Sequence, residues 1–328
     1  MSDAARLRAL TERFAGLRVG VLGDLILDRY VWGSVERISP EAPVPVVRVD
    51  HESVMLGGAG NVARNLASLG ARVWLAAVTG DDDPAREITR LCARWKIDAG
   101  GVIADASRPT TLKTRVIARA QQVVRYDRET ERPIAAAVVD DLLEGLRAQA
   151  GQLDGVIVED YGKGLLTLDV LREAMAIFGE HEVAVFVDPK EGEWEIYRGA
   201  ELVKPNLREA EQILRLRVQG EADLERLGQK LLERTGVRNV AITRGEGGIS
   251  IFSRSEGVHH VPTVSRPVAD VAGAGDTAIA TLTLARLAGA SWREAAELAN
   301  AAAGFVVAIP GTATLTPEDL LRSFGASA

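Results

Sequence analysis

The sequence predicts an α/β fold in which a central, mostly parallel sheet is covered by helices and a small β-lobe acts as a lid. Short runs rich in β-branched residues alternate with longer helical patterns along the 328 residues, which is typical of parallel sheets. Two segments, at about 28–50 and 110–128, interrupt this alternation with further β-rich sequence. No repeat, low-complexity tract or long linker divides the chain, so we expect a single domain over residues 1–328.

The elements are expected in the following order. LRVGVLGDLI, from Leu17, predicts a buried first strand. GGAGNVARNLASLG, from Gly57, predicts a helix, because its apolar residues recur at i, i+3 and i+4 before Gly70 ends it. Further strands are expected at RVWLAAV, DGVIVED, VAVFVD, ELVKPN and NVAIT, with helices in most of the gaps.

The two segments of the β-lobe are rich in Val, Ile, Tyr and Thr, and the first also contains prolines that suit an edge strand. We expect the lobe to cover a site at the strand ends of the main domain. An exposed sheet edge is prone to association, so the lobe is also a candidate for pairing with a second subunit.

Composition narrows the classes of partner. Apolar residues make up 47% and charged residues 26% of the chain, enough for a substantial core. The net charge of −7, from 39 basic and 46 acidic groups, argues against nucleic acid or an anionic membrane as the main partner. A small anionic substrate needs only a local cluster of Arg and Lys.

The cysteine content and the absence of long apolar runs predict a cytoplasmic protein. Cys92 is the only cysteine, so a reducing compartment is expected. It lies in the amphipathic stretch REITRLCARW, which favours a buried, inert thiol. The first 17 residues lack the apolar region of a signal peptide, and no apolar run is long enough to span a bilayer.

The most informative segment is DVAGAGDTAIA, from Asp270. Gly273, Ala274 and Gly275 open a helix of small and apolar residues, whose N-terminus should therefore lie inside the protein. Free backbone N–H groups there form an anion site that a phosphate can approach closely. Asp276, in the first turn, is placed to take a proton from an attacking hydroxyl. Alternatively, the glycines only permit tight packing and Asp276 is a helix-start charge.

A glycine-rich turn at Gly57-Gly58-Ala59-Gly60-Asn61 precedes the first predicted helix. Its glycines would let the backbone approach a polyol, and Asn61 and Asn65 are expected opposite the apolar stripe, where they would bind hydroxyls. Gly58, Gly60 and Ala63 also match G-x-G-x-x-A, with Asp81 about twenty residues further on. That dinucleotide fingerprint should follow the first strand directly, whereas here a lobe intervenes. A plain packing turn is the third interpretation.

Two further turns follow predicted strands. Asn206 and Glu209 suit a helix capping box, or they lie near Mg²⁺ and the nucleotide phosphates and act through water. Thr243, Gly245 and Gly248 predict either a loop that touches nucleotide or a hairpin turn.

Charged residues also occur at predicted strand ends, where open α/β sheets bind ligands. They are Asp24, Asp160 and Lys163. Plain surface charge is the alternative for each of them.

Taken in order, these segments resemble the ribokinase-like (PfkB-type) carbohydrate kinase family. The resemblance runs from Val19 to about Pro317, and its two signatures correspond to Gly57–Asn61 and Asp270–Thr277. It implies the ribokinase-like fold, ATP and Mg²⁺ as cofactors and, in some relatives, a monovalent cation near Asp270. Some relatives carry a fused adenylyltransferase domain; this sequence ends soon after IPGTATLT, so a stand-alone kinase is expected.

Within the family, the stretches GDLILDRYVWGSVERISPEAPVPVV, MLGGAGNVARNLASLG, DYGKG, KPNLRE and IPGTATLT resemble members that act on D-glycero-β-D-manno-heptose 7-phosphate. The implied reaction moves the γ-phosphate of ATP to the anomeric 1-hydroxyl, giving the 1,7-bisphosphate for the lipopolysaccharide inner core. A homodimer through the β-lobes is also implied.

The resemblance implies roles for these residues. Asp276 would be the base, and the loop of Gly273, Ala274 and Gly275 would stabilise the phosphoryl group. The heptose would contact Asp24, Gly57, Gly58, Asn61, Asn65 and Asp160. ATP would contact Asn206, Glu209, Thr243, Gly245, Gly248, Gly273 and Gly275, with Asn206 and Glu209 supporting Mg²⁺. The 7-phosphate would bind cations among Lys113, Arg115, Arg119, Arg125 and Lys163, each of which is otherwise ordinary lid-surface charge.

Three positions depart from the family pattern. Ala272 stands where Thr is usual, Glu159 where Ser is commoner, and Arg244 lies inside the T-x-G turn. None of them is the expected base. The alternatives to a heptose phosphate kinase are a kinase for another sugar, a catalytically inactive nucleotide-binding regulator, and a dehydrogenase built on the G-x-G-x-x-A match.

Overall fold

A nine-stranded sheet forms the centre of the molecule. The computed structural model describes residues 3–119, 121–190, 192–263, 268–309 and 311–325, so Pro310 of the IPGTATLT stretch lies outside it. Within these ranges the sheet runs β13-β12-β11-β10-β9-β8-β1-β4-β5. The strands are β1 (Arg18–Gly23), β4 (Arg72–Thr79), β5 (Asp98–Ala104), β8 (Gly155–Glu159), β9 (Ala184–Asp188), β10 (Leu202–Val203), β11 (Asn239–Thr243), β12 (Ile249–Ser253) and β13 (Gly257–Val261).

Pairing within this sheet is parallel from β5 to β11 and antiparallel only where β11, β12 and β13 meet. Alternate residues of each strand therefore face opposite layers of helices. Val19 and Val21 of β1 belong to one buried cluster, and Leu22 belongs to the other. This arrangement confirms the expected α/β fold.

Helices cover both faces. One layer contains α1 (Ala4–Glu12), α2 (Ala59–Ser68), α3 (Asp83–Arg94), α8 (Ala274–Leu287), α9 (Trp292–Val306) and α10 (Pro317–Gly325). The other contains α4 (Ala136–Ala150), α5 (Leu168–Glu180), α6 (Leu207–Leu214) and α7 (Glu221–Thr235). Cys92 is buried in α3, and burial raises the pKa of its thiol to about 11, as expected for an inert thiol. None of the described helices is long and apolar enough to cross a membrane.

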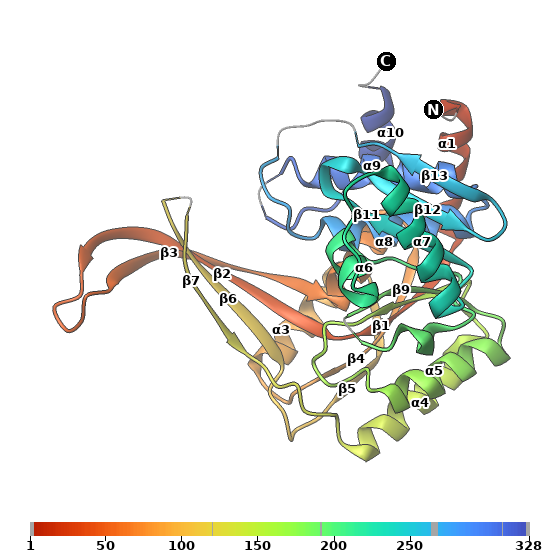
Figure 1. The fold of residues 1–328 in the computed structure, drawn as a ribbon. Helices are drawn as coiled ribbons and strands as arrows, with labels where there is room; N and C mark the ends of the chain where they lie inside the picture. The colour runs from red at the N-terminus through yellow and green to blue at the C-terminus, as the bar shows by residue number, and fades with distance from the viewer. Residues whose placement is uncertain (1–2, 120, 191, 264–267, 310, 326–328) are drawn as a thin grey trace.

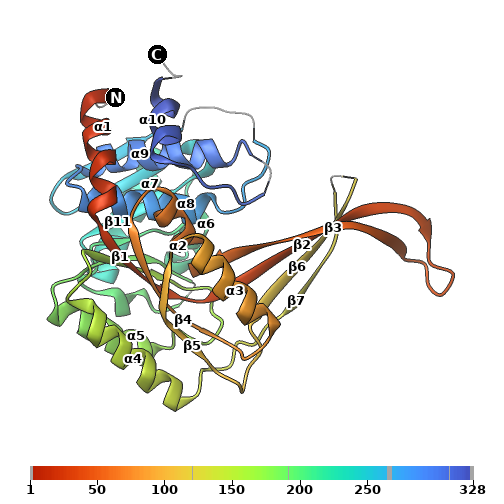
Figure 2. The ribbon, with the colours of Figure 1, turned by 180° about the vertical axis from the view of Figure 1, so that it is seen from behind.

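A second, smaller sheet projects from one side of the main body (Figures 1 and 2). Among the described residues it contains four strands in the order β3-β2-β6-β7. These are β2 (Leu25–Ile38), β3 (Pro45–Gly58), β6 (Thr111–Ala118) and β7 (Gln121–Arg128). β2 pairs antiparallel with β3 and parallel with β6, and β6 pairs antiparallel with β7. We call this sheet the lobe; its strands come from the two β-rich segments singled out in the sequence.

The structure corrects the expected first strand and first helix. LRVGVLGDLI is divided, because the chain leaves the main sheet after Gly23 and enters the lobe at Leu25. Asp24, at the junction, accepts the backbone N–H of Ala59 on its carbonyl oxygen. Gly58 ends β3 rather than starting the helix; its φ is +55°, and a Cβ there would lie 2.4 Å from the carbonyl oxygen of Asp24. The hairpin strands β12 and β13 have no counterpart among the predicted strands.

Candidate active site

The N-terminus of α8 lies inside the protein, as its apolar sequence predicts. Every residue from Asp276 to Ala285 is buried. Gly273 caps the helix with a φ of +78°, and a Cβ there would lie 2.9 Å from Nδ2 of Asn61. Glycine is therefore required at the start of the helix. The exposed N–H groups of the first turn form an anion site in a poorly solvated setting.

Asp276 is held at the start of this helix by two side-chain donors. The residue is 8% exposed; its Oδ2 accepts from Nδ2 of Asn61 at 2.5 Å and its Oδ1 from the hydroxyl of Tyr161 at 3.3 Å. Burial raises the pKa of Asp276, and these hydrogen bonds oppose that shift. The charge of Asp276 and burial raise the pKa of Tyr161 well above its usual value, so its hydroxyl stays protonated and donates. A desolvated carboxylate with a raised pKa is a competent proton acceptor.

A buried charge network lies behind Asp276. Carboxylate oxygens of Glu159, Asp188 and Asp276 lie within 4.8 Å of one another, and Nζ of the buried Lys204 lies 2.7 Å from Oδ2 of Asp188. Burial, then the charge of Asp188, raises the pKa of Glu159 well above its ordinary range. Burial opposes the charge on Lys204, but its acidic neighbours outweigh burial and raise its pKa.

Sequence reasoning did not assign roles to Tyr161, Asp188 and Lys204. Each had a signal, since Asp188 and Lys204 end or follow predicted strands and Tyr161 lies within DYGKG. Tyr161, Asp188 and Lys204 lie at or just after the ends of β8, β9 and β10, which are side by side in the sheet.

Asp24 lies at the junction of the main sheet and the lobe, between β1 and β2. It is buried, and its Oδ2 accepts the backbone N–H groups of Tyr161 and Lys163 at 3.0 and 2.9 Å. Burial raises the pKa of Asp24, while these hydrogen bonds lower it. Oδ1 of Asp160 accepts the backbone N–H of Gly162 at 2.8 Å. Burial raises the pKa of Asp160 to about 6.

The two asparagines of α2 differ in what they can contact. Asn61 points at Asp276 and joins the candidate site. Asn65 is fully buried, donates to the carbonyl oxygen of Asn61 at 2.9 Å and accepts from the hydroxyl of Thr277 at 2.9 Å. Asn65 therefore links α2 to α8 through hydrogen bonds. It does not reach the substrate site, contrary to the prediction from the sequence.

Four of the five candidate phosphate-binding cations lie near one another. Arg125 is opposite Arg115 on the neighbouring strand, and burial, together with the charges of Lys163 and Arg125, lowers the pKa of Lys113. Lys163 lies 2.8 Å from Glu129 and 3.2 Å from Glu131. Arg115 lies 2.5 Å from Asp28, and Arg125 lies 2.7 Å from Asp127. Arg119, at the turn after β6, is exposed and donates to the carbonyl oxygen of Val35. Its place in this exposed turn sets it apart from the other four cations.

Lys113 differs from these four. Its Nζ lies 5.6 Å from the centre of the Tyr161 ring, and no ion pair within 4.0 Å joins it to a carboxylate of the described ranges. Tyr161 also donates to Asp276, so Lys113 lies on the side of the lobe that faces the candidate base.

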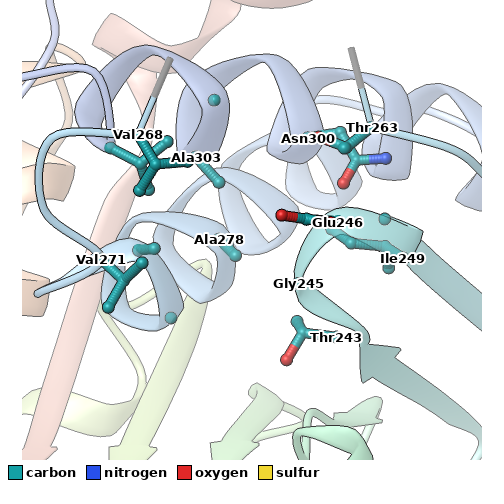
Figure 3. A pocket seen from close by; sticks show the side chains of 15 residues that line it. Thr243, Gly245, Glu246, Ile249, Thr263, Val268, Val271, Ala278, Asn300 and Ala303 are labelled. Atoms are coloured by element: carbon teal, nitrogen blue, oxygen red, sulfur yellow. The ribbon is translucent and has the colours of Figure 1, made fainter. Parts of the chain in front are cut away.

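A cavity of about 680 Å³ leads from the surface to the start of α8. Figure 3 shows Val268, Val271 and Ala303 on one side of it, and Thr243 and Glu246 on the other. Gly245, Gly248, Ala274 and Gly275 also line it. The segment at 243–248 is a hairpin turn between β11 and β12, so it is both a turn and a wall of this cavity. Its mostly apolar wall ends at the first turn of α8, an arrangement that suits a nucleoside phosphate.

Asn206 and Glu209 form the capping box that the sequence suggested. The backbone N–H of Glu209 donates to Oδ1 of Asn206 at 3.0 Å, and that of Asn206 donates to Oε2 of Glu209 at 2.8 Å. One carboxylate oxygen of Glu209 remains for a further contact. Lys204, two residues before this cap, has its Nζ 3.7 Å from where a Cβ on Gly275 would lie, so the cap is close to the start of α8.

Residues 18–319 match the model of the pfkB family carbohydrate kinases. The chain belongs to this family. It is 45% identical over 305 residues to the bifunctional protein HldE of Geobacter metallireducens, covering 93% of this chain and 62% of that protein. It is 43% identical to the bifunctional protein HldE of Geobacter sulfurreducens, covering 98% of this chain and 66% of that protein. The chain thus spans just under two thirds of the length of these relatives.

Solved pfkB-type kinases share the fold. Escherichia coli phosphofructokinase-2 in complex with potassium superposes with a TM-score of 0.77 at 21% identity, covering 94% of this chain and 99% of that one. Arabidopsis thaliana ribokinase complexed with ribose and ATP gives 0.74 at 17% identity, covering 94% and 98%. The ribokinase-like architecture with its smaller sheet is therefore established for this chain.

The dinucleotide-binding interpretation is wrong for this member of the pfkB family. The G-x-G-x-x-A match begins at the end of a lobe strand rather than after β1. Gly60 packs against the lobe, since a Cβ there would lie 2.7 Å from Cδ1 of Leu25 and 3.0 Å from Cβ of Leu56. Gly60 is therefore needed for close packing. Because the sequence match is not a dinucleotide-binding turn, the dehydrogenase alternative is wrong.

Proposed function

We propose that this chain is an ATP-dependent kinase that phosphorylates the anomeric 1-hydroxyl of D-glycero-β-D-manno-heptose 7-phosphate. The observation that carries the proposal is the position of Asp276, a buried carboxylate at a helix N-terminus between the nucleotide-sized cavity and the lobe. The resemblance of the lobe sequence to heptose phosphate kinases supports the choice of sugar. The relatives named bifunctional protein HldE are consistent with it.

In the proposed reaction, the sugar hydroxyl attacks the γ-phosphorus of ATP while the bond to ADP breaks. The hydroxyl proton moves to Asp276, which Asn61 and Tyr161 hold in place. General base catalysis of this kind contributes about 10²–10⁴ in rate. The backbone N–H groups of Gly275 and Asp276, in the first turn of α8, stabilise charge on the phosphoryl group in transfer, whereas that of Ala274 already donates to the carbonyl oxygen of Val271.

Magnesium is expected with ATP, and the cap of α6 offers hard oxygen atoms of the kind that Mg²⁺ prefers. The oxygen of Glu209 that the capping box leaves over is the candidate, acting through water, with Asn206 beside it. The ion would neutralise phosphate charge during transfer.

The sugar end is proposed to lie between Asp24 and the lobe. Asp24 is fixed by two backbone N–H groups and has a second oxygen for sugar hydroxyls. Of the lobe cations, Lys113 is the candidate for the substrate phosphate, because it is not paired as Arg115, Arg125 and Lys163 are. Closure of the lobe over the bound sugar would exclude water and limit ATP hydrolysis.

The test is ADP release from Mg-ATP with heptose 7-phosphate, fructose 6-phosphate, ribose and fructose, using wild type and Asp276→Asn. Selective turnover of heptose 7-phosphate, reduced about 10²–10⁴-fold in the variant with ATP binding retained, is expected. If another sugar is turned over instead, with the same loss of rate in Asp276→Asn, the mechanism stands and the proposed substrate is wrong. Absence of turnover with every sugar would favour an inactive nucleotide-binding regulator.

A further inference from the structure

Arg64 is a buried cation without an adjacent carboxylate. Its residue is 5% exposed, and no carboxylate of the described ranges makes an ion pair with it within 4.0 Å. Its Nη2 donates to Oδ1 of Asn61 and to the carbonyl oxygen of Thr312, each at 2.7 Å, and its guanidinium lies 5.9 Å from the centre of the Trp95 ring. Burying such a charge is unfavourable unless another interaction compensates.

Asn61 joins this cation to the proposed base. Its Oδ1 accepts from Arg64 at 2.7 Å, and its Nδ2 donates to Asp276 at 2.5 Å. The opposite rotation of the amide would place its NH₂ group against the guanidinium and its oxygen against the carboxylate. Both contacts would then be repulsive, so Arg64 selects the rotation in which Asn61 donates to Asp276.

The surroundings keep Arg64 in this position. Thr312, which accepts its other hydrogen bond, also lies against the helix start, since Cγ2 of Thr312 would be 3.4 Å from a Cβ on Gly273. Arg64 follows Asn61 by three residues on α2, so both side chains lie on the same face of that helix. The charge of Asp276 and that of Arg64 attract each other across the amide.

We propose that Arg64 is a positioning residue for phosphoryl transfer, which fixes the side-chain amide of Asn61 so that it donates to the carboxylate of Asp276. This inference rests on the proposed function only in assigning Asp276 as the base. The arrangement itself belongs to the folded chain and does not depend on which sugar is the substrate.

A double-mutant cycle tests the proposal. Arg64→Met removes the charge and the donors but keeps an unbranched side chain, and Arg64→Lys keeps a charge and a donor. Arg64→Met is expected to lower kcat about 10–100-fold, by analogy with the loss of groups that orient metal ligands, with little change in KM for ATP. Arg64→Lys should recover part of the loss. In an Asn61→Ala background, Arg64→Met should lower kcat no further, because its effect passes through Asn61.

Unchanged kcat in Arg64→Met, or losses that multiply in the double variant, would overturn the proposal. Thermal unfolding checks that each variant is folded; should Arg64→Met not fold, Arg64→Gln, which keeps a donor without the charge, enters the same cycle.

A second readout needs no turnover. The Asn61 side-chain amide, assigned in ¹H–¹⁵N spectra by its loss in Asn61→Ala, should be shifted by its short bond to Asp276. Arg64→Met and Asp276→Asn should both abolish that shift. If the chemical shift of the Asn61 side-chain amide is the same in Arg64→Met as in wild type, the positioning role is contradicted even in an active kinase. Inactivity of the wild type towards every sugar would instead count against the proposed function and leave the amide result to decide this inference.

Discussion

At the scale of single residues, the candidate site contains ionisable groups whose pKa values are shifted by burial. Asp276 and Glu159 both have raised pKa values with burial as the first cause. The two carboxyl groups differ in their hydrogen bonds. Asp276 receives hydrogen bonds from Asn61 and Tyr161, whereas one oxygen of Glu159 has no hydrogen-bond partner among the described residues. The hydrogen bonds stabilise the ionised form of Asp276, which is the form that accepts a proton.

Lys113 should determine recognition of the substrate phosphate. Lys113→Met is expected to raise KM for the sugar phosphate by about 10-fold or more, since a charged hydrogen bond of about 1.5–3 kcal/mol is lost, while KM for ATP stays the same. Steady-state kinetics with both substrates varied measure the effect. Arg119→Met, at the outer end of the lobe, is the matched control and should behave as wild type. Equal increases in both KM values for Lys113→Met would contradict the assignment.

Asp160 should make stability depend on pH. Its pKa is raised to about 6, so between its unfolded pKa and pH 6 the folded state binds more protons than the unfolded state. Stability then falls as pH rises through this window. Asp160→Asn is expected to stabilise the protein by about 1–3 kcal/mol at pH 8 and to have little effect at pH 4. Urea unfolding at both pH values measures this, with the exposed Asp169→Asn as control. An equal effect at the two pH values would refute the role of ionisation.

At the scale of elements, the N-terminal ends of two helices position residues of the candidate site. The start of α8 is fixed by Gly273, whose positive φ and contact with Asn61 exclude a side chain. The start of α6 is fixed by the reciprocal hydrogen bonds of Asn206 and Glu209. The cap explains why these two residue types occur at this spacing, but it occupies only one carboxylate oxygen of Glu209.

Two variants of Glu209 should separate its structural role from its chemical role. Glu209→Gln keeps an oxygen for the N–H of Asn206, so stability should change little, whereas Glu209→Ala loses the cap and about 1 kcal/mol. If Glu209 also supports Mg²⁺, both variants should need more Mg²⁺ for half-maximal rate. Titration of activity with Mg²⁺ and thermal unfolding measure the two effects. If Glu209→Gln needs the same Mg²⁺ concentration as wild type, Glu209 acts only as a helix cap and does not support Mg²⁺.

At the scale of the whole molecule, the lobe is the part of the chain that stands away from the body (Figure 1). It begins immediately after β1 and returns immediately before α2, so its movement would act directly on Asp24 and Asn61. Its outer strands are exposed: every residue of β7 is solvent-accessible, including Val124 at 48% and Tyr126 at 55%. An exposed strand edge with apolar side chains favours pairing with a partner.

We predict a homodimer formed through the lobes. Val124→Asp combined with Tyr126→Asp should shift the protein to a monomer, because charges would be buried in the interface. Val258→Asp is the control, since Val258 lies on β13, outside the lobe, with a comparable 44% exposure. Sedimentation velocity measures the oligomeric state. A wild-type monomer at micromolar concentration, or a dimer that survives the double substitution, would show that the lobe edges do not associate.

The sequence by itself determined the α/β class, the buried N-terminus of α8 and the position of Asp276, because periodicity, apolar composition and glycine turns are local properties of the chain. It also indicated the capping box and both lobe segments. Only the tertiary structure decided which side chains meet. Asn65 links α2 to α8 through hydrogen bonds, Arg119 bonds to β2 at an exposed turn, and Asp188, Lys204 and Arg64 lie around Asp276. These residues are separated by up to about two hundred positions, and their proximity follows from strand order and helix packing, which no local pattern encodes.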